Sequence, residues 1–162
     1  MSYVPYSPNA QGLTEVLIDL KNAFPGIVAQ KVTGYETTAF ENLNQGDAVY
    51  SRASDGQIGK AIANDTLDKA FVAGFVETTV SQGQTARVIV AGAIANSGLD
   101  AGDEYYLSAA SAGAIVKTPP STAGQYVTRV GEAVNTAQLV IRLEPPIPVS
   151  YTHLTLPTSD LV

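Results

Sequence analysis

The stretch GDEYYLSAASAGAIVKTPP, from Gly102 to Pro120, repeats an earlier stretch of the chain, GDAVYSRASDGQIGKA, from Gly46 to Ala61. Each stretch begins with Gly-Asp, places a tyrosine three positions after the aspartate, and continues into a Ser-x-Gly-x-Ile-x-Lys pattern. The two copies lie about 57 residues apart, and a later landmark, Gly74 matched by Gly131, keeps this spacing. The sequence therefore predicts that one structural unit occurs twice in the chain.

The Gly-Asp pair that opens each copy is typical of a turn that leads into a strand. Glycine supplies a positive φ, and an aspartate beside it accepts a local backbone hydrogen bond. The tyrosine that follows suits a strand edge, where the ring is buried and the hydroxyl stays accessible. We expect these positions to be the signature turns of the fold: Gly46, Asp47, Tyr50, Gly102, Asp103 and Tyr106.

Short runs of strand-forming residues dominate the segment 27–148. Runs rich in Val, Ile, Thr and Tyr are separated by glycine-containing turns at close spacing, and the run at 70–79 is predicted as one strand. A single unit has only one face to bury, so two units must cover each other. We therefore predict a mainly β domain, a small antiparallel barrel or sandwich made of two pseudo-repeated units.

The segment 1–26 has a different pattern, which predicts an arm followed by one short amphipathic helix. Apolar residues recur at helical spacing, and Pro25 and Gly26 then end the pattern. The helix either packs onto the β domain or docks on another copy or another protein. The candidate docking residues on its apolar face are Leu13, Val16, Leu17, Leu20 and Phe24.

The segment 149–162 differs again from the residues before it. Its first ten residues, VSYTHLTLPT, resemble the conceptual translation of a sequencing-library adapter read in one frame. We therefore expect 149–162 to be a non-native tail, with LVIRLEPPIP before it as the last strand and its exit. The alternative is a genuine polar extension.

The composition argues against several classes of function. The formal net charge is -6 and no run of Lys or Arg occurs, which argues against a nucleic-acid partner. The chain has no cysteine, and its one histidine, His153, lies in the suspect tail, so thiolate or imidazole chemistry is not expected. No apolar run approaches the ~20 residues that cross a bilayer. We expect no cofactor, no metal and no membrane partner.

The acidic residues are the remaining candidates for catalysis. Two carboxylates about 5 to 10 Å apart in a cleft would suit a glycosidase. The two aspartates, however, each lie beside a turn glycine, and a structural role explains them. The sequence therefore favours a protein that is not an enzyme. The acidic residues considered for such a pair are Asp47, Glu77, Asp103, Glu104 and Glu132.

The segment from about Ile27 to Pro148 resembles a β-rich domain of tailed-phage virions. The stretches that carry the resemblance are GDAVY…DGQIGKA, VAGFVETTVSQGQTARVIVAG, GDEYYLSAASAGAIVKTPP and YVTRVGEAVNTAQLVIRLEPPIPV. Similar stretches occur in capsid decoration proteins and in head or tail fibre proteins. The resemblance implies a non-enzymatic virion protein that forms a homotrimer and binds the major capsid or fibre proteins.

A second interpretation belongs to another class, a carbohydrate- or receptor-binding module of a tail fibre. The chain has 8 tyrosines, and tyrosine rings can form a platform for sugars. A binding module should expose several aromatic rings on one face. A decoration protein should instead expose an apolar patch that is complementary to itself.

Overall fold

The computed structural model describes residues 33–150, and in this range nearly all regular structure is β. The one helix of the described range is α3, Leu67–Ala70. The strands are β1 (Thr33–Thr38), β2 (Ala48–Ser51), β3 (Ile58–Lys60), β4 (Gly74–Val76), β5 (Thr85–Ala95), β6 (Glu104–Leu107), β7 (Ile115–Val116), β8 (Tyr126–Val127), β9 (Arg129–Asn135), β10 (Gln138–Ile141) and β11 (Ile147–Pro148).

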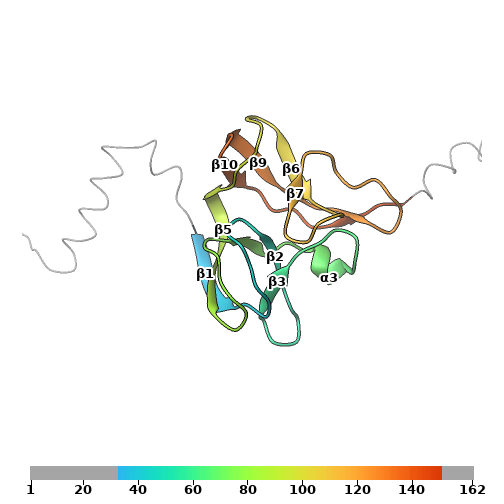
Figure 1. Ribbon diagram of the computed structural model, residues 1–162. Helices are drawn as coiled ribbons and strands as arrows, with labels where there is room; N and C mark the ends of the chain where they lie inside the picture. Colours follow the sequence, from blue (N-terminus) through green and yellow to red (C-terminus); the bar gives the residue numbers. More distant parts are fainter. Residues whose placement is uncertain (1–32, 151–162) are drawn as a thin grey trace, which may run out of the picture. The chain divides into compact units, whose positions relative to one another are not determined.

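Nine strands form one curled antiparallel sheet in the order β3-β2-β4-β5-β10-β9-β6-β7, with β1 added on β5. Strands β8 and β11 form a separate two-stranded sheet. In Figure 1, β6, β7, β9 and β10 lie above β1, β2 and β3, and β5 reaches between the two groups. The sheet is a half-barrel, which confirms the predicted mainly β, antiparallel, barrel-like fold.

The sheet order makes the predicted repeat visible. In the first copy the hairpin β2–β3 pairs through β2 with β4, and in the second the hairpin β6–β7 pairs through β6 with β9. The registers agree: Val49 of β2 lies opposite Gly74, and Tyr105 of β6 lies opposite Gly131. Positions matched in the sequence therefore occupy matched positions in the sheet.

Backbone hydrogen bonds around the Gly-Asp turns repeat in the same way. In each copy the glycine N–H donates to a carbonyl of the strand that pairs with the hairpin, β4 or β9, and the N–H of the same residue donates back to the aspartate carbonyl. The bonds are Gly46 N–H to Val76 C=O (2.9 Å) and Val76 N–H to Asp47 C=O (3.0 Å), matched by Gly102 N–H to Ala133 C=O (2.7 Å) and Ala133 N–H to Asp103 C=O (2.9 Å).

The two copies share one hydrophobic core. The larger buried cluster contains residues of both copies, such as Phe75 from β4 and Leu139 from β10, both fully buried. The copies join where the C-terminal half of β5 pairs with β10, with Ile94 opposite Leu139. Each copy therefore covers apolar surface that the other would leave exposed, as predicted.

The first copy also has a second buried face. A smaller cluster there includes Val49, Val76 and Val88, and is covered by Ala39 and Leu43 from the segment that follows β1. Side chains alternate between the two faces along a strand. Successive residues of β2 and β4 therefore enter different clusters, which explains why the run Ala48–Tyr50 and the pair Phe75–Val76 have no polar residue between them.

The predicted strand at 70–79 is wrong over most of its length. The structure has α3 ending at Ala70 and a strand only at Gly74–Val76. The side chain of Thr66 accepts a hydrogen bond from the Lys69 N–H (3.4 Å), and this cap starts a helix just before the predicted strand, which overlaps it at Ala70. The helix that begins at the Thr66 cap therefore replaces the first part of the predicted strand, although the residues there are apolar.

Three sequence predictions concern residues outside the described range. They are the N-terminal helix, the boundary after residue 26, and most of the expected non-native tail. At the C-terminal end of the range, the Val149 N–H donates to the Gln125 carbonyl (2.8 Å), which extends the pairing of β8 with β11.

Candidate assembly site

The predicted docking residues cannot be part of a site described by the structure. Leu13, Val16, Leu17, Leu20 and Phe24 all lie outside residues 33–150. Within residues 33–150, the candidates for an assembly site are the signature turns, the charged clusters and the exposed apolar side chains of the β domain.

The two signature glycines form the turns that the sequence predicted. Gly46 and Gly102 both adopt left-handed backbone conformations, with φ of 86° and 87°. The carboxylate of Asp47 accepts a hydrogen bond from the Asn44 N–H (2.8 Å), and the Asp47 N–H donates to the Asn44 carbonyl (3.0 Å), so the two bonds close the turn from both ends. The turn at Gly46 leads into β2 and the turn at Gly102 leads into β6, so both glycines have a structural role.

The carboxylate of Asp47 lies at the contact between the two copies. The turn before β7 covers it: the Ala48 N–H donates to the Gly113 carbonyl (2.9 Å), and the Gly113 N–H donates to the Ala61 carbonyl (2.7 Å). Burial under this turn raises the pKa of Asp47 above its ordinary value. The Asn44 hydrogen bond and the charge of Lys60, 3.9 Å away, act in the opposite direction.

Asp103, the matching aspartate of the second copy, has open surroundings. Its carboxylate is about half exposed and pairs with Lys117 (3.3 Å), which also contacts Asp100 (2.6 Å). Hydrogen bonds to these two carboxylates raise the pKa of Lys117. Lys60 and Lys117 are matched in the repeat, so both copies pair the signature aspartate with the same lysine of the hairpin.

The two signature tyrosines also differ in burial. Tyr50 is buried and packs edge-on against Phe40, with ring centroids 5.9 Å apart, whereas Tyr106 is half-buried. The neighbouring Tyr105 is the buried ring of the second copy, and its hydroxyl accepts from the Asp100 N–H (2.9 Å). The expectation of a buried signature ring is therefore right for Tyr50 and wrong for Tyr106, because Tyr105 points into the core.

Four of the five acidic residues considered for catalysis take part in ion pairs. Asp47 and Asp103 pair with lysines as described, Glu77 pairs with Arg87 (3.6 Å), and Glu104 pairs with Arg129. Within residues 33–150, no three acidic or histidine side chains come close enough together to hold a metal ion. No helix of the described range is long and apolar enough to span a membrane.

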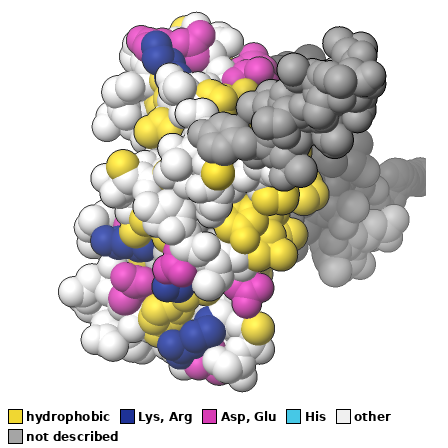
Figure 2. Space-filling view, turned by 90° about the vertical axis from the view of Figure 1, so that its right-hand side faces the viewer, with side chains coloured by type: hydrophobic (Ala, Val, Ile, Leu, Met, Phe, Trp, Pro, Cys, Tyr) yellow, Lys and Arg dark blue, Asp and Glu magenta, His cyan; other side chains and the backbone are white. Residues whose placement is uncertain are grey.

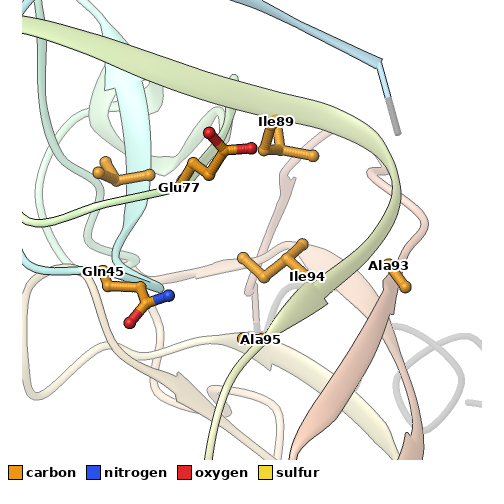
Figure 3. Close-up of a pocket in the computed structure, with 7 residues that line it drawn as sticks. Gln45, Glu77, Ile89, Ala93, Ile94 and Ala95 are labelled. Atoms are coloured by element: carbon orange, nitrogen blue, oxygen red, sulfur yellow. The ribbon is translucent and has the colours of Figure 1, made fainter. Parts of the chain in front are cut away.

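A hollow lined by residues of β4, β5 and the segments beside β4 and before β2 has polar and apolar walls. Its volume is about 150 Å³, and Figure 3 shows Gln45 and Glu77 beside Ile89 and Ile94. The hollow lies near Gly92, where β5 leaves the first copy and begins to pair with β10. It would hold a group of about the size of benzene.

Helix α3 carries two exposed apolar side chains at its ends. Leu67 is 52% exposed and Phe71 is 55% exposed. They flank a hollow of about 280 Å³ whose other lining residues include Ser51, Ala53 and Ala73. We call these five residues the α3 patch. Sequence reasoning missed it because it assigned Phe71 to a strand, where alternation would have buried it. Thr66 is a residue type that favours a helix N-cap, but one such residue does not predict a helix.

The α3 patch rests on a rigid base. Ala70, between Leu67 and Phe71, is fully buried, and its carbonyl accepts from the buried Thr128 hydroxyl (2.8 Å). The Ile62 N–H donates to the Lys69 carbonyl (3.0 Å). Figure 2 shows the side of the molecule on which α3 lies in Figure 1; hydrophobic side chains gather near its middle, and charged ones towards its ends.

No protein-family model matches the chain, and no curated protein matches its sequence.

Proposed function

We propose that the chain is a non-enzymatic structural protein of a phage virion, which decorates and stabilises the capsid or forms part of a head fibre. The stretches that resemble virion proteins are also those that build the repeated half-barrel. The observation that carries the proposal is the α3 patch: Leu67 and Phe71 are exposed on a helix that buried contacts hold in place. A rigid exposed apolar pair suits docking on a large assembly.

A decoration protein stabilises a shell by mass action. If it binds the assembled lattice and has little affinity for free capsid subunits, every bound copy shifts the equilibrium towards the intact shell. The proposed partners are therefore the major capsid or fibre proteins and further copies of the chain, as a homotrimer, and the proposed location is the virion.

The carbohydrate-binding alternative receives less support from the β domain. Of the large aromatic side chains in residues 33–150, only Tyr35 and Phe71 are exposed, and they belong to different elements, β1 and the end of α3. Several rings on one face would be needed to form a platform for a sugar.

Co-sedimentation with capsid shells tests the proposal. The full chain is mixed with shells assembled from the major capsid protein of the genome that encodes it, and in parallel with unassembled capsid subunits. We expect the chain to pellet with the shells and to remain unbound with the subunits. Binding to neither form would contradict a role in capsid decoration.

Removal of residues 1–26 tests the docking role of the predicted helix. The deletion ends before β1 begins at Thr33, so the described β domain keeps all its strands. We expect the shortened chain to bind shells more weakly than the full chain. Unchanged shell binding would show that the apolar residues of this segment do not dock on the capsid.

A further inference from the structure

We propose that Asp55 and Gly56 form a site of spontaneous isomerisation to isoaspartate, and that the folded turn, chiefly through Arg52, protects it. The two residues lie at the exposed tip of the β2–β3 hairpin, where Asp55 keeps 36% of its side chain accessible. A Cβ at Gly56 would meet no described atom within 4 Å, so this turn is open to water. The inference concerns the chemistry of the chain itself and does not rest on the proposed virion role.

The reaction needs only this pair of residues and water. The backbone nitrogen of Gly56 attacks Cγ of the protonated Asp55 carboxyl: the new C–N bond forms, the nitrogen loses its proton, and the hydroxyl group leaves as water. Glycine permits this attack because it has no side chain to obstruct the nitrogen. A water molecule then opens the resulting succinimide ring at either carbonyl carbon. One opening restores aspartate, and the other leaves the chain linked through the side-chain carbon, as isoaspartate.

Arg52 holds the reacting carboxyl group. Its Nε donates to one carboxylate oxygen of Asp55 (3.0 Å) and its Nη2 to the other (2.5 Å), which forms a bidentate pair. The guanidinium is itself fixed, because it lies 4.2 Å from the centre of the Phe40 ring and Nη2 also donates to Gln57 Oε1 (3.2 Å). Attack on Cγ removes the planar carboxylate that this pair binds, so the reaction has to break the pair.

The same pair keeps the carboxyl group in its unreactive form. The hydrogen bonds from Arg52 hold the pKa of Asp55 below its ordinary value, and the Gln57 N–H, which donates to Oδ1 (3.1 Å), acts in the same direction. A carboxylate reacts poorly because it has no hydroxyl group to release as water. The protonated, reactive fraction of Asp55 is therefore smaller than in an unfolded chain at the same pH.

The peptide group of Gly56 is held as well. Its N–H donates to the Arg52 carbonyl (2.8 Å), and its carbonyl accepts from the Thr37 hydroxyl of β1 (2.9 Å). The reaction therefore proceeds from the fraction of molecules in which the turn has opened locally. In the second copy, Ala112 stands at the position of Asp55, so only the first hairpin of the repeat can undergo this reaction.

Tryptic mapping by mass spectrometry measures the reaction. The full natural chain, Arg52→Lys and Arg87→Lys are incubated in warm, mildly acidic buffer and digested at intervals. Each chain releases the same peptide, residues 53–60, in which retention time and fragmentation distinguish isoaspartate from aspartate. We expect Arg52→Lys to accumulate isoaspartate several-fold faster than the natural chain, because lysine cannot form the planar fork. Arg87→Lys is the matched control, because Arg87 pairs with Glu77 and has no contact with this turn, and it should match the natural chain.

Incubation in concentrated guanidinium chloride separates protection by the fold from an effect of the local sequence. When unfolded, the natural chain and Arg52→Lys should form isoaspartate at equal rates, both faster than the folded natural chain. Unequal rates in the unfolded chains would overturn the protective role of Arg52. The proposal is also overturned if folding does not slow the reaction, if folded Arg52→Lys reacts no faster than the folded natural chain, or if Arg87→Lys reacts as fast as Arg52→Lys.

Thr37→Val decides the matter if circular dichroism shows that Arg52→Lys does not fold. This variant removes the hydroxyl that binds the Gly56 carbonyl, and it leaves Arg52 and residues 53–60 unchanged. Its folded chain should form isoaspartate faster than the natural chain, because the turn opens more often. A rate equal to that of the natural chain would then show that the contacts of the turn do not protect Asp55.

Discussion

At the residue scale, Gly56 and Gly113 occupy the same place in the two hairpins, and both have positive φ, 74° and 81°. A Cβ at Gly113 would lie 3.0 Å from the carboxylate of Asp47, whereas a Cβ at Gly56 would meet open space. Replacement by alanine should cost about 1–2 kcal/mol of backbone strain at either site. We predict a larger loss for Gly113→Ala, because its methyl group also displaces the Asp47 carboxylate.

Urea unfolding of the two glycine variants checks this prediction. The free energy of unfolding of Gly56→Ala gives the backbone strain alone, and the excess loss in Gly113→Ala reports the contact with Asp47. Equal losses would mean that the turn before β7 gives way without disturbing the aspartate.

Asp47 should also give the protein a pH-dependent stability. Its pKa is raised in the folded state, chiefly by burial, so folding favours the protonated carboxyl. This stabilising contribution is fully present below the ordinary pKa of 3.8, and is lost as the pH rises through the folded-state pKa. We predict that Asp47→Asn removes this dependence, so that the natural chain gains stability relative to the variant on acidification through that window.

Urea midpoints at a series of pH values, for the natural chain and Asp47→Asn, measure this difference. Asp103→Asn is the matched control, because it changes the equivalent turn of the second copy and leaves Asp47 in place. It should retain the contribution of Asp47. A difference between the natural chain and Asp47→Asn that does not change with pH would contradict the prediction.

At the element scale, a buried side-chain hydrogen bond anchors the end of helix α3. The Thr128 hydroxyl donates to the Ala70 carbonyl at 2.8 Å, and Thr128 is fully buried. Thr128→Val leaves this carbonyl unsatisfied and should lower the free energy of unfolding by about 1–3 kcal/mol. Amide exchange at Ala70, whose N–H donates to the Thr66 carbonyl, should become faster.

Thr128→Ser is the control for this change, because it keeps the hydroxyl and loses only a methyl group. It should cost about 1 kcal/mol and leave amide exchange at Ala70 nearly unchanged. If Ser and Val destabilise the chain equally, the hydrogen bond does not hold the helix.

The hairpins could be predicted from the sequence, and α3 could not. Gly46, Gly56, Gly102 and Gly113 all adopt the positive φ that glycine in a turn indicates, so local sequence was enough. The helix at Leu67–Ala70 spans four residues, too few for a hydrophobic period to appear. Phe71 is exposed because the helix ends there, and the Thr128 hydroxyl, from a residue far away in the sequence, holds that end in place. No local sequence pattern therefore predicts the α3 patch.

At the scale of the whole molecule, the shared core should make the two copies unfold together. The larger cluster contains Phe75 from one copy and Leu139 from the other. We predict a single thermal transition of the described domain, with calorimetric and van't Hoff enthalpies that agree. Leu139→Ala should lower stability by about 2–5 kcal/mol and shift that transition as a whole.

Differential scanning calorimetry of the full chain and Leu139→Ala tests this cooperativity. Two separate transitions, or a variant that melts in one half only, would show that each copy is stable alone. The repeat itself was evident in the sequence, but the way the copies join was not. The pairing of Ile94 with Leu139 depends on the length and bend of β5, which carries no local signal.

The unequal surroundings of the two hairpin turns have a consequence for how such a protein evolves. If the two copies were separate, identical chains, every mutation would occur in both of them. A residue that improved a turn buried between the copies would then also occur in the equivalent turn on the surface. Here both copies belong to one gene product, so the turn at Gly113 can specialise in covering Asp47. At Gly56 a Cβ would meet open space, so the positive φ restricts this residue and packing against a neighbour does not. Fusion of the copies thus allows the inner and outer versions of one sequence to diverge independently.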